Sequence, residues 1–265
     1  MNLIARNDKK YMINGKTIVG AMLVSQNADL LDITIPNLLK YCDWCLIVMD
    51  NQTEEVEQKV YKYQIANYGK IFVRTSSVPS RLYTNKGREK SYRERSKATK
   101  GIFRDDVFYD LRRILDWKKK GYEKIDILLW PDSDEIFTDY LPELLDDFWK
   151  SGKRAAMTKP VDVINDMNTI RRSDMQRHVH ILRYARDFSA YPWPIFAVYH
   201  PLTGKTVMKV DGCYSAHLAY LNDNIRKWRQ ENWKDHGSLD DKLIKLDKSV
   251  EYMNPYEIKE ALSSV

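Results

Sequence analysis

Four short apolar runs dominate the first half of the sequence and restrict the folds that it can adopt. They are residues 17–24 (TIVGAMLV), 44–49 (WCLIVM), 70–74 (KIFVR) and 125–130 (IDILLW). Their length and their β-forming residues predict buried strands. Segments with apolar residues at helical spacing separate the first three runs. A chain that alternates strand and helix in this way builds a parallel sheet with helices on both faces.

The helical segments carry start and stop signals. Asn27 can cap a first helix, although Pro36 inside the apolar stripe should bend or shorten it. Thr53 can cap a second helix that runs to about Asn67. A third, basic helix is expected to end near Lys120, just before the fourth strand.

The second half of the chain is less regular. Helices are expected at residues 142–150 and 222–234, strands at 154–163 and 181–184, and a hairpin pair at 196–199 and 206–210. These strands are expected to add to the same sheet in antiparallel or mixed fashion. We therefore predict an α/β fold: a mixed, mainly parallel sheet flanked by helices, with an irregular antiparallel C-terminal part. A single domain over residues 1–265 is expected.

The net charge of +6 is unevenly distributed. Residues 81–104 contain nine Lys and Arg against two acidic residues, and residues 171–186 contain five Arg against one Asp. The rest of the chain is therefore mildly acidic. Basic segments suit a nucleotide, a nucleic acid or another anionic surface, although each can also be a solvated face of a helix.

Two acidic clusters follow predicted strands, at the sheet edge where open α/β folds bind ligands. Asp50 comes directly after strand 44–49, and Asp132, Asp134 and Glu135 come after strand 125–130. Two carboxylates on one tight turn repel each other unless a cation or a basic group joins them. Mg²⁺ or Mn²⁺, held by one or two carboxylates and by substrate phosphates, is a common solution. The alternative is a solvated acidic turn.

Several other signatures are absent or weak. None of the ten glycines forms a Gly-x-Gly, and there is no Gly-x-Ser-x-Gly elbow, so neither a Rossmann fingerprint nor a serine hydrolase of that fold is indicated. Cys42 and Cys45, with Cys213 and His217, could in principle hold zinc. The first two lead into a buried strand, which favours buried structural thiols instead.

The order of these features resembles the nucleotide-binding half of GT-A glycosyltransferases of the family 2-like kind. Residues 24–29 (VSQNAD) match the family's first strand-to-helix turn in part, since its Glu is missing. Residues 50–53 (DNQT) match the turn after its second strand, and residues 132–135 (DSDE) match the Asp-x-Asp-Glu metal motif of one subgroup. The resemblance covers about residues 17–140, and beyond it only His217 fits.

The resemblance implies a donor site in residues 1–140 and an acceptor site in residues 141–265. The donor is a nucleoside-diphosphate sugar, expected to be UDP-linked, whose diphosphate is bridged by Mn²⁺ or Mg²⁺. Asp50 would contact the nucleobase or ribose, and Asp132 would lie near the ribose and the metal. Asp134 would be the main metal ligand, and His217 would be a metal or phosphate ligand from late in the chain. Glu135 would be part of the catalytic machinery. The leaving diphosphate lies within reach of the basic helix and its side chains Arg88, Arg93, Arg95 or Lys97.

An inverting enzyme also needs a general base for the acceptor hydroxyl. Asp162, Asp166 and Asp174 follow the metal motif and are candidates, of which Asp166 is favoured. Whether the transfer inverts or retains configuration stays open, as do the sugar, a hexose or a pentose, and the oligomeric state.

Two kinds of acceptor remain: a bacterial surface glycan, or a hydroxymethylated base in DNA, as in phage DNA-modifying enzymes. Arg residues and aromatic side chains around residues 184–193 give the DNA acceptor some support, because such surfaces stack bases. A non-catalytic nucleic-acid-binding protein on an α/β scaffold is the alternative to an enzyme, and a glycosidase is less favoured.

Location is inferred from what the sequence lacks. No apolar run approaches the ~18 residues of a membrane span, and the opening residues, MNLIARNDKK, lack an apolar signal core. Three cysteines are an odd count for a disulfide framework. We therefore expect a cytoplasmic protein, in the host cytoplasm if a phage encodes it.

Overall fold

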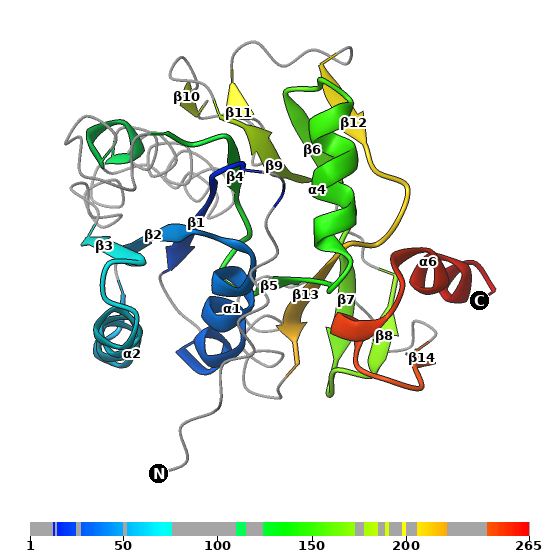
Figure 1. Cartoon of the computed structure of the whole chain (residues 1–265). Helices are drawn as coiled ribbons and strands as arrows, with labels where there is room; N and C mark the ends of the chain where they lie inside the picture. The colour runs from blue at the N-terminus through cyan, green and yellow to red at the C-terminus, as the bar shows by residue number, and fades with distance from the viewer. Residues whose placement is uncertain are drawn as a thin grey trace, which may run out of the picture.

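The structure of the chain, a computed structural model, describes residues 13, 15–24, 28–49, 52–75, 110–114, 124–172, 178–184, 189–190, 198–199, 206–221 and 243–264. Two β-sheets and the helices packed on them make up most of this part (Figure 1). The α/β class predicted from the sequence is confirmed.

The larger sheet has seven strands in the order β12-β6-β9-β4-β1-β2-β3. β4, β1, β2 and β3 run parallel, as predicted, and β12 is parallel to β6, whereas β9 is antiparallel to both of its neighbours. The sheet is therefore mixed and mainly parallel. Its strands are β1 (Ile18–Val24), β2 (Trp44–Met49), β3 (Ile71–Thr75), β4 (Ile127–Leu129), β6 (Ala155–Thr158), β9 (His178–Arg183) and β12 (Val207–Lys209).

Side chains of the larger sheet alternate between two apolar cores. In β2, Cys45 and Ile47 belong to one core, and Leu46 and Val48 belong to the other. The first core is closed by α1 (Ala28–Tyr41), α2 (Glu54–Ala66) and α4 (Leu141–Lys150). The second includes Leu111 and other apolar residues of the helical segment 110–114. Helices thus cover both faces, as the alternation of elements predicts.

The helix starts follow from local chemistry. Thr53 caps α2 as predicted, since its hydroxyl oxygen accepts a hydrogen bond from the Val56 N–H at 3.3 Å. Of the bend or shortening predicted at Pro36, the shortening does not occur, because α1 continues to Tyr41. Pro36 lies on the exposed face of α1, where water can bind the carbonyl that lacks its helical partner.

The smaller sheet has five strands in the order β14-β8-β7-β13-β5. All of its pairs are antiparallel except β13 with β7. Its strands are β5 (Glu135–Phe137), β7 (Val161–Ile164), β8 (Thr169–Arg171), β13 (Ser215–Tyr220) and β14 (Ile244–Lys245). The prediction that all the later strands add to the first sheet is therefore wrong.

Two prolines explain why strands pass from one sheet to the other. The chain leaves β4 for β5 through Trp130 and Pro131, and leaves β6 for β7 through Lys159 and Pro160. Proline has no N–H to give to a sheet ladder, so each strand stops where its proline stands. For this reason the strand predicted at 154–163 is two strands in two sheets.

The hairpin predicted from 196–199 and 206–210 is also wrong. β11 (Val198–Tyr199) pairs with β10 (Ser189–Ala190), whereas β12 pairs with β6. Turn residues between two strands indicate a change of direction but do not select the partner strand. The helix predicted at 222–234 lies outside the described residues.

The described chain ends in two short helices, η2 (Val250–Tyr252) and α6 (Pro255–Ser263). Val250 and Ile258 pack against the apolar face of the smaller sheet. None of the helices in the described ranges is both long and apolar enough to cross a membrane.

Candidate active site at the junction of the two sheets

The acidic turn 132–135 connects the larger sheet to the smaller one. It follows β4, and Glu135 is already the first residue of β5. The Asp132 N–H donates to Glu135 Oε2 at 3.0 Å, and the Glu135 N–H donates to the Asp132 carbonyl at 3.1 Å. Asp132 and Asp134 are half-buried, whereas Glu135 is buried. The turn is thus closed by its own last residue, with the two aspartates nearer the surface.

Four neighbouring strands of the smaller sheet each contribute one ionisable residue to a single row. Glu135 of β5 is paired in register with His217 of β13. His217 is paired in turn with Asp162 of β7, and Asp162 with Arg171 of β8. Directly paired residues lie on the same face of a sheet. We call these four residues the polar row. All four are buried, and the opposite face of the same strands is apolar.

His217 contacts an acid on each side of its ring. Its Nε2 lies 3.4 Å from Asp134 Oδ2, and its Nδ1 lies 3.0 Å from Asp162 Oδ1. Arg171 Nε and Nη2 each donate to Asp162 Oδ2 at 3.3 Å. The Leu218 N–H also donates to the Asp134 carbonyl at 2.6 Å, which fixes the turn against β13. The structure therefore brings together Asp134 and His217, which are 83 residues apart by their numbers.

Asp134 and His217 fit a divalent cation. Mn²⁺ and Mg²⁺ both bind carboxylate oxygen, and Mn²⁺, as a transition metal, also accepts imidazole nitrogen. Two adjacent ligands about 2.1 Å from an octahedral metal are about 3 Å apart. The 3.4 Å between Asp134 Oδ2 and His217 Nε2 is close to that separation. Among the described residues, no three His, Cys, Asp or Glu side chains form a metal-binding group. A metal here would take its other ligands from substrate phosphates and water, as Mg²⁺ usually does.

Glu135 is held in a second, fully buried chain of polar groups. Its Oε2 lies 2.7 Å from His180 Nε2, His180 Nδ1 bonds Thr158 Oγ1, and Thr158 Oγ1 lies 3.2 Å from Ser215 Oγ. These residues come from β5, β9, β6 and β13, so the chain joins the two sheets. The Trp130 N–H donates to the His180 carbonyl at 2.8 Å, which also fixes the start of the turn. This placement gives Glu135 a positioning role, and a catalytic role for it stays a prediction.

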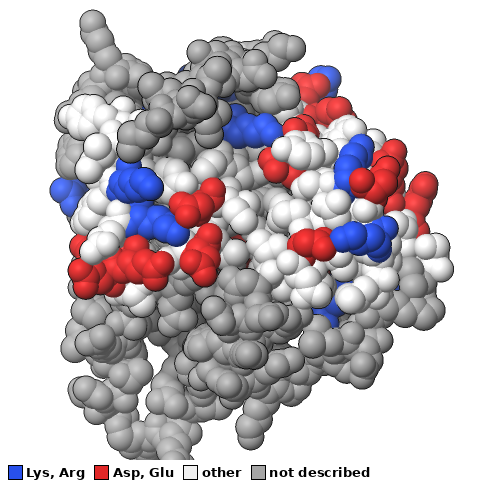
Figure 2. Space-filling view, turned by 90° about the horizontal axis from the view of Figure 1, so that it is seen from below, with Lys and Arg blue, Asp and Glu red and all other residues white. Residues whose placement is uncertain are grey.

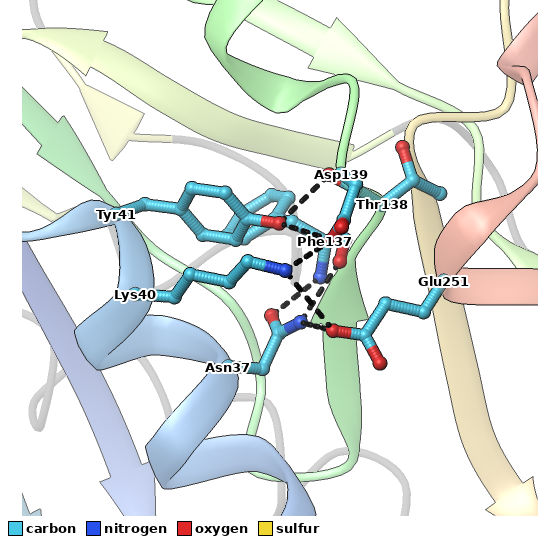
Figure 3. Close-up of polar contacts among 7 residues, drawn as sticks. All are labelled: Asn37, Lys40, Tyr41, Phe137, Thr138, Asp139 and Glu251. Carbon is cyan, nitrogen blue, oxygen red and sulfur yellow. Dashed lines mark hydrogen bonds and ion pairs between the residues drawn. The ribbon is translucent and has the colours of Figure 1, made fainter. Parts of the chain in front are cut away.

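The far end of β5 is fixed by α1 (Figure 3). The Asn37 side chain accepts from the Phe137 N–H at 2.8 Å and donates to the Phe137 carbonyl at 2.9 Å. β5 is the last strand of its sheet, so these bonds satisfy an edge that has no neighbouring strand. Lys40 pairs with Asp139 and lies 3.5 Å from Glu251 Oε1. Burial alone would lower the pKa of Lys40, but the bonds and charges of these acids raise it.

Asp166, the favoured general base, lies in an exposed turn between β7 and β8. Its Oδ2 accepts from Lys245 Nζ at 2.7 Å, and its Oδ1 accepts from the Asn168 N–H at 2.8 Å and from Thr169 Oγ1 at 3.0 Å. The Lys245 hydrogen bond, followed by the Asn168 bond, lowers the pKa of Asp166 to about 2. Asp162 is engaged by His217 and Arg171, and Asp174 lies outside the described residues.

Five predicted donor-site residues lie outside the described residues: Asp50, Arg88, Arg93, Arg95 and Lys97. The second basic segment is described in part. Arg171 belongs to the polar row, and Arg183 stacks on the Trp149 ring at 4.0 Å and donates to the Trp149 carbonyl at 2.6 Å. On the face drawn in Figure 2, acidic and basic side chains of the described residues lie side by side. On that face, the described residues form no continuous basic surface.

The cysteines are not part of the site. Each of the three is a buried thiol, with Cys42 and Cys45 in the core of the larger sheet and Cys213 in that of the smaller sheet. Burial raises the pKa of Cys45 to about 12 and also raises the pKa of Cys42. The expectation of buried structural thiols is confirmed.

Sequence reasoning missed four residues of this junction: Asn37, Thr158, His180 and Ser215. His180 stands in an ordinary apolar strand pattern (HVHILR), and the other three are small polar residues of common types. Asp162 and Arg171 were recognised only as a base candidate and as part of a basic segment. Nothing local in the sequence indicates that β7, β8 and β13 lie side by side, since that depends on tertiary pairing.

No protein-family model matches the sequence, and no curated protein matches it. Solved structures with a similar fold include S. aureus TarS 1–349, with a TM-score of 0.42, 12% identity, and coverage of 77% of this chain and 60% of that chain. That fragment is also known in complex with UDP.

Two further solved structures are similar in part. The mannosyltransferase PcManGT from Pyrobaculum calidifontis, in complex with GDP-Man and Mn²⁺, has a TM-score of 0.36 and 10% identity over 54% of this chain and 35% of that chain. Glucosyl-3-phosphoglycerate synthase from Mycobacterium tuberculosis, with Mn²⁺, UDP and phosphoglyceric acid, has a TM-score of 0.29 and 13% identity over 54% of this chain and 43% of that chain. This chain spans less than two thirds of each of the three structures. The function is therefore inferred from the acidic turn and the polar row themselves.

Proposed function

We propose that the protein is a metal-dependent glycosyltransferase that moves a sugar from a nucleoside-diphosphate sugar to an acceptor hydroxyl. The observation that carries the proposal is the pairing of Asp134 and His217, 3.4 Å apart at the carboxyl end of β4. That edge of an α/β sheet is where ligands bind. The Asp-x-Asp-Glu resemblance of residues 132–135 supports the same assignment.

In this proposal each residue has a defined task. A bound Mn²⁺ or Mg²⁺ supplies positive charge that stabilises the leaving nucleoside diphosphate. Asp134 and His217 hold the cation, and Asp132, with its N–H fixed by Glu135, lies beside the ribose. The remaining donor contacts are assigned to residues outside the described part: Asp50 to the nucleobase or ribose, and Arg88, Arg93 and Arg95 to the diphosphate. Residues 1–140 bind the donor and residues 141–265 the acceptor.

The acceptor and the base are proposed from the sequence alone. Asp166 stays the predicted general base, and UDP the predicted nucleotide. For the acceptor, a surface glycan and a hydroxymethylated base in DNA are separated by a DNA-binding measurement. Affinity that falls steeply with salt supports the DNA acceptor. Absence of DNA binding at low salt excludes the DNA acceptor.

A non-catalytic nucleic-acid-binding role is not favoured. It needs a surface of several exposed cations in the second basic segment. Of the three arginines of that segment that the structure describes, Arg172 is exposed, whereas Arg171 is buried against Asp162 and Arg183 is stacked on Trp149. A nucleic-acid-binding role also does not account for the 3.4 Å separation of Asp134 Oδ2 and His217 Nε2, which suits two ligands of one metal ion.

A thermal-shift screen tests the proposal. Nucleoside diphosphates are added with and without Mn²⁺, and we expect one of them to raise the melting temperature only when Mn²⁺ is present. Asp134→Ala should abolish both this shift and sugar transfer. Asp146→Ala is the matched control, because Asp146 is a half-buried aspartate of α4 whose only described ion pair is with Lys150. Full transfer by Asp134→Ala, or by the wild type in excess EDTA, contradicts the proposal.

A further inference from the structure

We propose that Asp162 and Arg171 are positioning residues that orient His217, so that its Nε2 faces Asp134 as a ready metal ligand. This inference rests on the proposed function. It goes beyond that function because neither Asp162 nor Arg171 touches the metal position. Both act through His217.

The hydrogen bonds around Asp162 determine which atom of His217 donates to it. Its Oδ2 accepts from both Nε and Nη2 of Arg171 at 3.3 Å, and its Oδ1 faces His217 Nδ1 at 3.0 Å. A carboxylate paired with a guanidinium has only acceptors to offer. His217 Nδ1 must therefore carry a proton, and whenever the ring is neutral the Nε2 lone pair faces Asp134. Metal-bound histidines show this same arrangement, with the second ring nitrogen donating to a carboxylate.

The His217 ring has little freedom to rotate. Asp162, Arg171 and His217 are each 3% exposed and are direct cross-strand neighbours. Tyr220 closes the group, with its ring 4.4 Å from Arg171 Cζ and edge-on to the His217 ring at 6.2 Å. Rotation of the imidazole would break the Asp162 bond and displace Tyr220, so the ring is held in one orientation.

On the other side of the His217 ring, Nε2 faces the carboxylate of Asp134. An unprotonated Nε2 and a carboxylate oxygen both carry lone pairs, and they lie 3.4 Å apart. Two such acceptors repel each other unless a proton or a metal cation lies between them. Because Asp162 holds Nδ1 as the donor, a divalent cation that displaces a proton from Nε2 takes the position between the two atoms. The polar row thus makes the site ready for a divalent cation before the donor arrives.

Mn²⁺ alone is the probe for the test, with bound and free ion measured by electron paramagnetic resonance in the absence of nucleotide. Loss of such a hydrogen-bonded partner typically weakens metal binding 10–100-fold. We expect the dissociation constant of Mn²⁺ to rise by about that factor in Asp162→Asn and in the double variant Asp162→Asn, Arg171→Met. The double variant removes both buried charges together, so it avoids the instability of a lone buried guanidinium. The control is Asp211→Asn, an exposed aspartate outside the polar row whose carboxylate pairs with Lys259, which should leave Mn²⁺ binding unchanged.

A second readout needs no substitution at Asp162. In the metal-free wild type labelled with ¹⁵N-histidine, long-range proton–nitrogen spectra at a pH where the imidazole is neutral report which ring nitrogen carries the proton. The chain has five histidines, and His217→Gln identifies the signal of interest. The proposal requires the proton on Nδ1. A proton on Nε2 overturns it.

The outcomes separate this inference from the proposed function. If Asp134→Ala and His217→Ala leave Mn²⁺ binding unchanged, the metal site itself is wrong and both fail. If those two variants lose Mn²⁺ but Asp162→Asn and the double variant bind it as the wild type does, the proposed function stands and the positioning role is refuted.

Discussion

The side-chain amide of Asn37 makes both hydrogen bonds to Phe137 that a neighbouring strand would make. Asn37→Ala leaves the N–H and the carbonyl of Phe137 unsatisfied at a buried strand edge, and each such loss costs about 1–3 kcal/mol. We expect a free energy of unfolding lower by about 2–4 kcal/mol in urea titrations. Gln58→Ala, which removes an exposed bond to Glu54, should change it little. Equal stability of Asn37→Ala and wild type would show that the edge does not need α1.

Glu135→Gln distinguishes a positioning role from a catalytic one. The change removes the charge of a buried pair with His180, and breaking a buried pair typically costs about 3–5 kcal/mol. We expect the loss to appear as a lower melting temperature, with the kcat of the remaining folded enzyme changed less than 10-fold. A kcat lower by 100-fold or more at unchanged stability supports the catalytic role instead.

The pair of Asp166 and Lys245 makes a pH-dependent contribution to stability. Asp166 has a pKa of about 2 in the folded chain against an ordinary 3.8. Because its pKa is lower in the folded chain, the ionised Asp166 stabilises the fold at pH values above 3.8. That contribution to stability is lost as the pH falls from 3.8 towards 2. We expect the stability difference between wild type and Asp166→Asn to shrink over that interval, and Lys245→Ala to raise the Asp166 pKa in an NMR titration. An Asp166 pKa unchanged by Lys245→Ala would contradict this.

The same variant tests Asp166 as the general base. Removal of a base typically lowers kcat by 10²–10⁴-fold. If Asp166 serves that role, Asp166→Asn should lose at least 100-fold in kcat at neutral pH while remaining folded. A loss of kcat below 10-fold would show that Asp166 has a structural role in the turn, through its pair with Lys245, and is not the base.

Gly20 of β1 is required because Leu38 of α1 lies against it. A Cβ built at Gly20 would lie 2.9 Å from the Leu38 side chain. Overpacking of this kind costs about 1–3 kcal/mol, so Gly20→Ala should lower the unfolding free energy by that amount. The double variant Gly20→Ala, Leu38→Ala should be less destabilised than the sum of the two single changes. Simple additivity would show that the two residues do not compete for space.

Elements fixed by local chemistry could be predicted from the sequence. β2 and the cap of α2 at Thr53 were predicted correctly, because a continuous apolar run and a capping side chain determine them. Helices on both faces of a parallel sheet follow from the order of the elements. The acidic turn was found for a similar reason: two carboxylates directly after a strand are visible in the sequence.

What could not be predicted depends on which strands become neighbours. Arg171 was counted with a basic segment, yet it is buried, because β8 pairs with β7 and places it beside Asp162. Asn37 was passed over in the same way, since only the position of β5 as an edge strand gives its amide a partner. The second sheet was missed because Pro131 and Pro160 mark the end of a strand without showing where the next one goes.

The crossing of the chain between two sheets has a consequence for synthesis on the ribosome. Asp134 is translated 83 residues before His217, which belongs to β13, the strand that inserts between β5 and β7. Until β13 has been translated, β5 and β7 each lack the neighbouring strand that separates them in the finished sheet. A nascent chain therefore exposes two strand edges for several seconds at ordinary elongation rates of about 5–20 residues per second. Chaperones that recognise open strand edges are expected to act on this protein in that interval, before any metal can be bound.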